Sequence, residues 1–598
     1  MNLPRVAEGC VEPVIRSNQH LRPTPPDFKE DPSMRFLSAS LASMAMALAA
    51  APPAMAKDAP GATIAPSLAM PAVTEQVPQD APRLIVAISV DQFSADLFAQ
   101  YRQHFTKGFT RLLQGGVYAQ GFQSHAATET CPGHSTLLTG VHPARTGITA
   151  NSWYVPGIGR ADKEVYCVED ESDPRSTPDV PVVSPKHLLA PTLGDLMKKA
   201  NPKTINAAVS AKDRAAVMMS GHDTDAVYWI GDKGFTTFAG RRISKAAEAE
   251  NADLARRIAA GDGPLAVPGW CGRVDRATPI GNFTIGTWRF PATAGDYKSY
   301  VNGPRIDTAT AEMAVRMVDE LGMGKDAVPD VLSVSFSATD KVGHAFGTEG
   351  VEMCVQMNVL DEALGYLFDQ LDARGIDYEV VLSADHGGFD APERQQLRGN
   401  PDAVRIDPAL SAKALAAAVS QDTGVTVKNG PLFYGAGEAG SVWLSAELTP
   451  EQKAKVIPAL VARLKANPQI AEVYTQDQIM QWPEPKGHPQ DWTMEQKVRA
   501  SFVPGRSGEV QMLTVRGVVP GKAAPFKVAS HGSPWDYDRR VPMLFWRKGM
   551  TGFEQPNPVE TVDIAPTLAA TVGLSAPAGT WDGRCLDIDA AEADSCRR

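Results

Sequence analysis

Four uninterrupted apolar runs mark this chain, at residues 83–90, 205–210, 331–336 and 378–383. A strand buried on both faces of a parallel sheet has a continuous apolar sequence rather than an alternating one. A helix is expected after the first run, from Ala95 to Phe105, and another near the end, over residues 562–572. The pattern therefore predicts an α/β fold with a largely parallel central sheet flanked by helices.

Each of the four runs ends at charged or metal-binding residues. In chain order these residues are Asp91, then Lys212 and Arg214, then Asp340 and His344, and finally Asp385 and His386. In open α/β sheets, ligands bind at the carboxyl edge of the strands. One aspartate after a strand is usually a turn residue, but four such ends are hard to explain as turns. We therefore expect a functional site at this edge.

Two long stretches interrupt the alternation of strands and helices. Residues 221–300 are rich in glycine and aromatic side chains, and residues 395–525 contain two alanine-rich or amphipathic helical stretches, 410–419 and 450–465. We expect both to be insertions that build a cap beside the site; the alternative is that they are independent domains. The catalytic core would then consist of residues 83–220, 301–394 and 526–598.

The N-terminal segments predict export. Residues 1–33 are polar and proline-rich, and are interpreted as a non-native upstream extension. From Met34, a charged start, an apolar run and an A-x-A site ending at Ala56 are typical of a secretory signal peptide, residues 34–56. Its apolar run is too short to span a bilayer. We expect a flexible lead-in over residues 57–82 and a periplasmic or secreted protein without a transmembrane anchor.

Composition argues against one class of function, and the cysteine count predicts disulfides. The net charge is −11 and no basic tract is present, which argues against a nucleic-acid-binding domain but not against an anionic substrate. Beyond Cys10, six cysteines remain, and an even number in an exported protein suggests three disulfides. Many pairings are possible; the favoured one is sequential: Cys131–Cys167, Cys271–Cys354 and Cys585–Cys596.

Six residues form a candidate set of divalent-metal ligands. They are Asp91, Asp340, His344, Asp385, His386 and His531. Carboxylate and imidazole without thiolate suit Zn²⁺, with Mn²⁺ or iron as alternatives. Two ions about 3.5–4 Å apart can hold the attacking and leaving oxygens of an in-line displacement.

A candidate nucleophile lies in the segment Thr130-Cys-Pro-Gly-His-Ser135. Proline is favoured at the start of a helix, so Thr130 is expected at or beside a helix N-terminus, which suits an anion. By itself a threonine there would be a capping residue. Next to bound metal, its hydroxyl could be deprotonated and act as a nucleophile and a metal ligand. The nearby His134 is expected to make a structural hydrogen bond.

These segments together resemble the alkaline phosphatase superfamily, more narrowly the branch it shares with nucleotide pyrophosphatases/phosphodiesterases. The matching segments begin at Ser89, Thr130, Thr339, Ser383, Ser530 and Asp563. The resemblance implies two Zn²⁺ ions, a phosphothreonine intermediate at Thr130, and phosphoryl binding by the Asn151 amide and nearby backbone N–H groups. It places one ion at Asp340, His344 and His531, and the other at Asp91, Asp385 and His386 beside Thr130.

The pair Lys212 and Arg214 suggests the substrate class. A lysine charge beside an arginine fork complements the dianion of a phosphate monoester. The pair resembles that of periplasmic threonine-nucleophile alkaline phosphatases, so small phosphate monoesters are the expected substrates. The alternatives are a phosphodiesterase, nucleotide pyrophosphatase or phosphonate monoester hydrolase on the same site, or a non-catalytic phosphate- or metal-binding module.

Overall fold

The central sheet places the four predicted apolar strands side by side. In this computed structural model they are β2 (Leu84–Val90), β6 (Asn206–Ser210), β11 (Asp330–Phe336) and β12 (Tyr378–Ser383). Their order is β12-β2-β11-β6, and all three pairings are parallel. The predicted α/β class is confirmed, and the predicted site edge is a single edge of this sheet.

Six further strands complete a mixed sheet of ten. They are β3 (Gly116–Phe122), β7 (Ala226–Gly231), β8 (Gly234–Thr236), β19 (Arg540–Arg547), β20 (Phe553–Gln555) and β21 (Val559–Glu560). The full order is β20-β3-β19-β12-β2-β11-β6-β7-β8, with β21 also beside β3. Strand β19 is antiparallel to both of its neighbours, β12 and β3.

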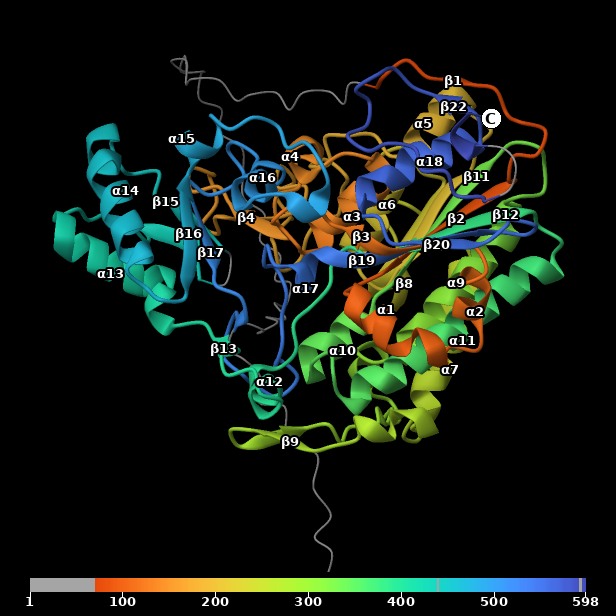
Figure 1. Cartoon of the computed structure of the whole chain (residues 1–598), viewed down its shortest axis with the longest axis horizontal. Coiled ribbons are helices and arrows are strands. Elements are labelled where there is room, and N and C mark those ends of the chain that lie inside the picture. Colours follow the sequence, from red (N-terminus) through yellow and green to blue (C-terminus); the bar gives the residue numbers. More distant parts are fainter. Residues whose placement is uncertain (1–69, 438–439, 591–593, 598) are drawn as a thin grey trace, which may run out of the picture. The chain divides into compact units, whose positions relative to one another are not determined.

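Helices cover both faces of the sheet, as the continuous apolar runs require. On β2, Leu84, Val86 and Ile88 face one layer of buried side chains, while Ile85 and Ala87 face the other. The two layers lie on opposite sides of the sheet in Figure 1. The first layer includes α1 (Ala95–Tyr101), α2 (Gly108–Leu112), α7 (Lys245–Ala260), α9 (Arg305–Leu321), α10 (Ala338–Phe346) and α11 (Val351–Ala373), and the second α3 (Thr130–Thr139), α5 (Leu193–Ala200) and α18 (Ile564–Thr571).

The sheet extends into the first expected insertion, residues 221–300. Strand β7 pairs with β6 in the central sheet, and β8 pairs with β7. The residues that follow, including Leu254 and Phe290, join the same buried layer as α9 and α11. Much of this stretch is therefore part of the core. Strand β7 could not be predicted from a continuous buried run, because only its middle residues are buried. Two of these are the large aromatics Tyr228 and Trp229.

The second expected insertion, residues 395–525, contains a sheet and a hydrophobic cluster of its own. The sheet is antiparallel, in the order β14 (Phe433–Ala436), β15 (Ser441–Leu444), β17 (Val510–Thr514) and β16 (Ile470–Thr475). Helices α13 (Ala412–Thr423) and α14 (Pro450–Lys465) lie beside this sheet in Figure 1. Both contribute apolar side chains to the same cluster. Helix α14 starts where predicted because Thr449 and Gln452 form a reciprocal capping box. We call this region the lobe.

Three disulfides pair the cysteines in the predicted sequential order: Cys131–Cys167, Cys271–Cys354 and Cys585–Cys596. The first joins α3 to the end of a short antiparallel hairpin formed by β4 (Ser152–Tyr154) and β5 (Glu164–Tyr166). Asn151, a predicted phosphoryl-binding residue, directly precedes this hairpin.

The structure describes residues 70–437, 440–590 and 594–597, all within one unit, Pro66–Arg598. The upstream extension, the signal peptide from Met34 to Ala56 and the first part of the lead-in lie outside these residues. Among the helices described, none has the length and apolar character needed to cross a membrane.

Candidate active site

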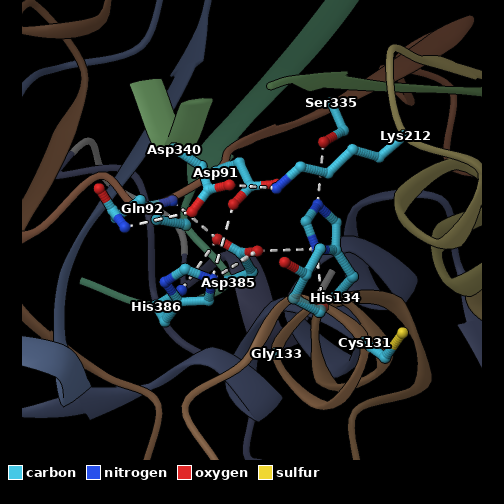
Figure 2. Close-up of polar contacts among 12 residues, drawn as sticks. Asp91, Gln92, Cys131, Gly133, His134, Lys212, Ser335, Asp340, Asp385 and His386 are labelled. Atoms are coloured by element: carbon cyan, nitrogen blue, oxygen red, sulfur yellow. Dashed lines mark hydrogen bonds and ion pairs between the residues drawn. The ribbon is translucent and has the colours of Figure 1, made fainter. Parts of the chain in front are cut away.

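The carboxyl ends of β2, β11 and β12 bring five of the six predicted metal ligands together, and His531 joins them from the segment before β19. Ligand atoms of Asp91, Asp385 and His386 all lie within 4.8 Å of one another, and so do those of Asp340, His386 and His531. The sixth residue, His344, has its Nε2 atom 3.2 Å from Asp340 Oδ1. Figure 2 shows Asp91, Asp340, Asp385 and His386 converging at this point. The His386 imidazole belongs to both groups.

All three histidines of this cluster have the same orientation. In each, Nδ1 faces a backbone carbonyl, which fixes the proton on Nδ1 and leaves the Nε2 lone pair free. The carbonyls belong to Ala529 for His344 (2.9 Å), Gly387 for His386 (2.8 Å) and Thr128 for His531 (2.8 Å). Each Nε2 then points to a carboxylate of the cluster, at 3.2 to 3.6 Å. This is the tautomer and direction that a metal-ligating histidine needs.

The cluster concentrates negative charge in a buried place. Burial, and then the neighbouring Asp385 carboxylate, raise the pKa of Asp91 to about 7, whereas the Lys212 ammonium opposes this shift. Burial also lowers the pKa of His386 to about 3, so its imidazole is neutral. The Lys212 ammonium lies 2.7 Å from Asp91 and 2.5 Å from Asp340, between the two carboxylates (Figure 2). The electrostatics of this site therefore favour cations.

Two residues that the sequence left without a metal-site role hold the carboxylate ligands in place. Gln92 has a left-handed backbone (φ 65°), its N–H donates to Asp385 and its side-chain amide donates to Asp340, both at 3.1 Å. The buried His134 places Nδ1 3.0 Å from Asp385 and Nε2 2.9 Å from Ser335 Oγ (Figure 2). His134 thus has a structural role, and the group it supports is a predicted ligand.

Thr130 is the first residue of α3, as its sequence context predicts. Its Oγ1 is buried and makes no hydrogen bond within the described part of the chain. The neighbouring hydroxyls differ: Thr128 donates to the Ser533 carbonyl at 2.8 Å, and Ser135 donates to the Pro132 carbonyl at 2.7 Å. Of these three hydroxyls, Thr130 alone has no protein partner, which is the condition expected of a nucleophile.

Asn151 is held next to Thr130 by three hydrogen bonds. Its Oδ1 accepts the Cys131 N–H at 2.8 Å, its N–H donates to Glu129 Oε2 at 2.7 Å, and its carbonyl accepts the Cys167 N–H at 2.9 Å. Because Oδ1 is engaged, the side-chain NH₂ is the group left for a ligand. The Cys131 N–H donates to Asn151 Oδ1. This backbone donor is therefore engaged within the protein, whereas the backbone N–H groups near Thr130 were expected to bind the phosphoryl group. No sequence pattern predicted this role of Glu129.

Arg214 is positioned by a tyrosine that the sequence analysis did not identify. Its Nη1 donates to the Tyr166 hydroxyl at 3.3 Å, and that hydroxyl donates to Asp213 at 2.7 Å. Arg214 Nε is buried and makes no hydrogen bond among the described residues, so this donor is available to an anion. Tyr166 ends β5 and directly precedes Cys167. One hairpin, tied to α3 by a disulfide, therefore positions both Asn151 and Arg214.

Comparisons with known proteins place this site in a family. Residues 85–533 match the family described as type I phosphodiesterase / nucleotide pyrophosphatase. The chain is 48% identical over 519 residues to alkaline phosphatase PhoK of a Sphingomonas species, covering 86% of this chain and 92% of that protein. It is 45% identical over 530 residues to alkaline phosphatase PhoD of Zymomonas mobilis, covering 88% and 91%.

The crystal structure of alkaline phosphatase PafA, a protein found in Elizabethkingia meningoseptica, has a similar fold. The TM-score is 0.74 at 26% identity, covering 86% of this chain and 99% of PafA. Another matched structure is a PafA variant with substitutions at a threonine, an asparagine, a lysine and an arginine. The chain belongs to the type I phosphodiesterase/nucleotide pyrophosphatase family of the alkaline phosphatase superfamily.

Proposed function

We propose that this protein is an exported, zinc-dependent alkaline phosphatase that hydrolyses phosphate monoesters to an alcohol and inorganic phosphate. The observation that carries the proposal is the convergence of three carboxylates and three correctly oriented imidazoles beside a hydroxyl that has no hydrogen-bond partner among the described residues. The relatives PhoK and PhoD, which match most of this chain, are named alkaline phosphatases. Their similarity supports the same activity here.

The donor set fits two Zn²⁺ ions. Asp91 Oδ1 and His386 Nε2 are buried, face each other at 3.6 Å and make no hydrogen bond among the described residues, as expected of atoms that bind a cation. We assign Asp340, His344 and His531 to one ion, and Asp91, Asp385, His386 and the Thr130 oxygen to the other. Bound there, zinc would lower the pKa of the Thr130 hydroxyl and neutralise charge on the leaving oxygen.

Thr130 is the proposed nucleophile. Its Oγ1 forms a bond to phosphorus as the bond from phosphorus to the alcohol oxygen breaks, and the alcohol leaves with a proton. Water then displaces Thr130 from the phosphothreonine, which restores the hydroxyl and releases inorganic phosphate. The position of Thr130 at the N-terminus of α3 favours the negative phosphoryl group because the helix dipole is positive there.

Asn151, Lys212 and Arg214 would bind the phosphoryl oxygens and select the monoester dianion. The Asn151 NH₂ group and the Arg214 Nε donor have no partner among the hydrogen bonds described above. In the PafA variant the substituted residues are the same four types in the same order: threonine, asparagine, lysine and arginine. This agreement supports catalytic or binding roles for Thr130, Asn151, Lys212 and Arg214 here.

The family description also includes phosphodiesterases, so diester hydrolysis is the second candidate function. We suggest comparing kcat/KM for p-nitrophenyl phosphate, bis(p-nitrophenyl) phosphate and p-nitrophenyl phenylphosphonate. A monoesterase should prefer the first by several orders of magnitude, because only that substrate presents a dianion to Lys212 and Arg214. Preference for the diester or the phosphonate would reject the proposed function in favour of the alternative.

Export is proposed from two observations. Three disulfides are typical of proteins that fold in an oxidising compartment. The sequence from Met34 to Ala56 has the features of a signal peptide, although it lies outside the described residues. N-terminal sequencing of the mature protein should find a start near Lys57. Recovery of the uncleaved chain from the cytoplasm would contradict this assignment.

A further inference from the structure

A cleft of about 400 Å³ leads from the metal-ligand cluster to the lobe. On the core side it is lined by Asn151, His344 and His531. On the opposite side it is lined by residues of β15 and β17, including Ser441 and Gln511. The volume is in the range of cavities that bind small molecules. The lobe therefore forms one wall of a space that adjoins the candidate catalytic groups.

The position of this cleft suits the leaving group, an inference that rests on the proposed phosphomonoesterase function. In an in-line displacement the leaving oxygen lies opposite the attacking oxygen. Thr130, the proposed nucleophile, is absent from the described residues that line the cleft, whereas His344 and His531 are among them. The alcohol portion of a substrate thus has room on the side of these two histidines.

Apart from the two predicted metal-ligand histidines, the ionisable groups described in the cleft are mainly carboxyl groups. Among its described lining residues there is no lysine or arginine, but there are three carboxyl groups, those of Glu129, Glu164 and Asp538. None of the three forms an ion pair within the described part of the chain. Lys212 and Arg214, the cations proposed to bind the phosphoryl group, do not line the cleft.

The three carboxyl groups are fixed by neighbouring donors. Glu129 accepts the Asn151 N–H, and Asp538 accepts the N–H and hydroxyl of Ser533 at 2.8 and 2.6 Å. Glu164, on β5, lies beside Tyr154: burial first, and then the Glu164 carboxylate, raise the pKa of the Tyr154 hydroxyl. These hydrogen bonds hold the Glu129 and Asp538 carboxyl groups in place, so their field acts on whatever occupies the cleft.

We propose that this cleft binds the leaving group and selects it by charge. Phosphate monoesters of neutral or cationic alcohols are favoured, and those whose alcohol carries a carboxylate or a second phosphate are disfavoured. A carboxylate roughly 7 Å from a charge on the leaving group, at an effective dielectric constant of about 40, changes kcat/KM by about 5- to 10-fold. All three carboxyl groups lie outside the lobe, so the core side of the cleft supplies the charge that selects the leaving group.

The phosphates of tyramine, tyrosol and 4-hydroxyphenylacetic acid test the proposal. Their leaving phenols have similar acidity but carry a positive, zero or negative charge. At pH 8 and low salt, kcat/KM should fall in that order by about 5- to 10-fold at each step, and high salt should narrow the range. Equal values for the three, or the opposite order, would overturn the proposal. If none is hydrolysed, the phosphomonoesterase function itself fails, which is a distinct outcome.

Glu164 offers the most direct variant because it has no place in the proposed metal or phosphoryl sites. Glu164→Gln should reduce the preference for the tyramine ester over the 4-hydroxyphenylacetate ester several-fold, and Glu164→Lys should reduce it further. The exposed Glu472, on β16 in the lobe, is the control, and Glu472→Gln should leave the ratio unchanged. If Glu164→Lys does not fold, Glu164→Gln decides; an unchanged ratio in the folded variant overturns the proposal.

Discussion

Single residues determine where phosphoryl transfer would occur. Near the ligand cluster the hydroxyls of Thr128 and Ser135 donate to backbone carbonyls, while Thr130 Oγ1 has no such partner in the described structure. A hydroxyl already bound to a carbonyl must lose that bond to attack phosphorus. The difference in hydrogen bonding therefore favours Thr130 over its neighbours.

Thr130→Ala should lower kcat for p-nitrophenyl phosphate by on the order of a thousandfold or more, because the nucleophile is lost while the other groups remain. Acid quenching with labelled substrate should trap a phosphoenzyme in the wild type and none in the variant. Ser135→Ala is the matched control and should still form the intermediate. A phosphoenzyme in Thr130→Ala would transfer the role of nucleophile to another residue.

Tyr166→Phe should weaken monoester hydrolysis by about tenfold, the size of one hydrogen bond to a charged group. The variant removes the hydroxyl that positions Arg214, while leaving the guanidinium in place. Hydrolysis of bis(p-nitrophenyl) phosphate should change much less, because a diester carries a single charge. Tyr118→Phe removes a buried phenol that bonds to the Asp587 carbonyl, and serves as control. Equal losses on both substrates would mean that Tyr166 has only a structural role.

Some site residues could be predicted from the sequence and others could not. Asp91, Asp340 and Asp385 follow buried strands, so the parallel sheet itself brings them to one edge. Glu129 and Tyr166 act through hydrogen bonds to Asn151 and Arg214, which are distant in sequence. Nothing local in the chain specifies such partners, because they depend on how the β4–β5 hairpin packs against α3 and α6 (Asp213–Ser220).

At the scale of elements, α3 lies against the loop that carries the metal ligands. A Cβ atom on Gly133 would come within 2.0 Å of the Asp385 carbonyl oxygen, so only glycine permits this approach. The proline and glycine of the motif thus have separate effects: Pro132 suits the first turn of α3, and Gly133 sets its distance from Asp385.

Gly133→Ala should therefore destabilise the fold by about 1–3 kcal/mol or more, because backbone must move to relieve the contact. Gly133→Ala should also reduce metal affinity, because the added methyl group would displace the backbone of Asp385, a proposed metal ligand. Thermal unfolding and zinc titration would measure the two effects. Gly159→Ala is a suitable control, because no atom lies within 4 Å of its Cβ position. Equal behaviour of the two variants would contradict this account of the packing.

His142, which directly precedes α4 (Pro143–Thr146), should make a pH-dependent contribution to the free energy of unfolding. Burial tends to lower the pKa of His142, but hydrogen bonds to Asp582 and Glu560, both 3.1 Å away, raise it from 6.5 to about 9. A raised folded-state pKa gives stability that is complete below about pH 6.5 and is lost as the pH rises through about 9. The contribution is about 3 kcal/mol at most.

His142→Gln should accordingly lower the Tm by a few degrees at pH 6 and have little effect at pH 10. The exposed His488 provides the control: His488→Gln should be neutral at both values. The same loss of Tm at pH 6 and pH 10 would show that His142 contributes packing rather than charge.

At the scale of the whole molecule, the sequence predicts the sheet better than the regions around it. Continuous apolar runs locate β2, β6, β11 and β12 because strands buried on both faces leave that signature. The same rule misses β7, which is buried only in its middle. The predicted first insertion, residues 221–300, therefore includes a strand that belongs to the central sheet. The lobe was recognised through its helices, but its sheet and its place at the cleft depend on tertiary packing.

The molecule as a whole then combines a core that carries the proposed metal and phosphoryl sites with a lobe that borders the proposed leaving-group cleft. Six ligands from four distant segments converge only in the folded chain, so metal binding should also stabilise the fold. Zinc should raise the Tm of the metal-free protein. Variants that lack two ligands of one set, such as Asp340→Ala with His531→Ala, should bind one zinc ion fewer. Zinc should then raise their Tm by a smaller amount.

The central claim, phosphate monoester hydrolysis by a two-metal site, is tested most directly by metal removal and return. Bound metal and turnover of p-nitrophenyl phosphate would be measured on the same samples after chelation and during zinc titration. The account predicts loss of turnover in the metal-free protein and recovery that is complete near two zinc ions per chain. Full turnover by protein without bound metal would contradict it.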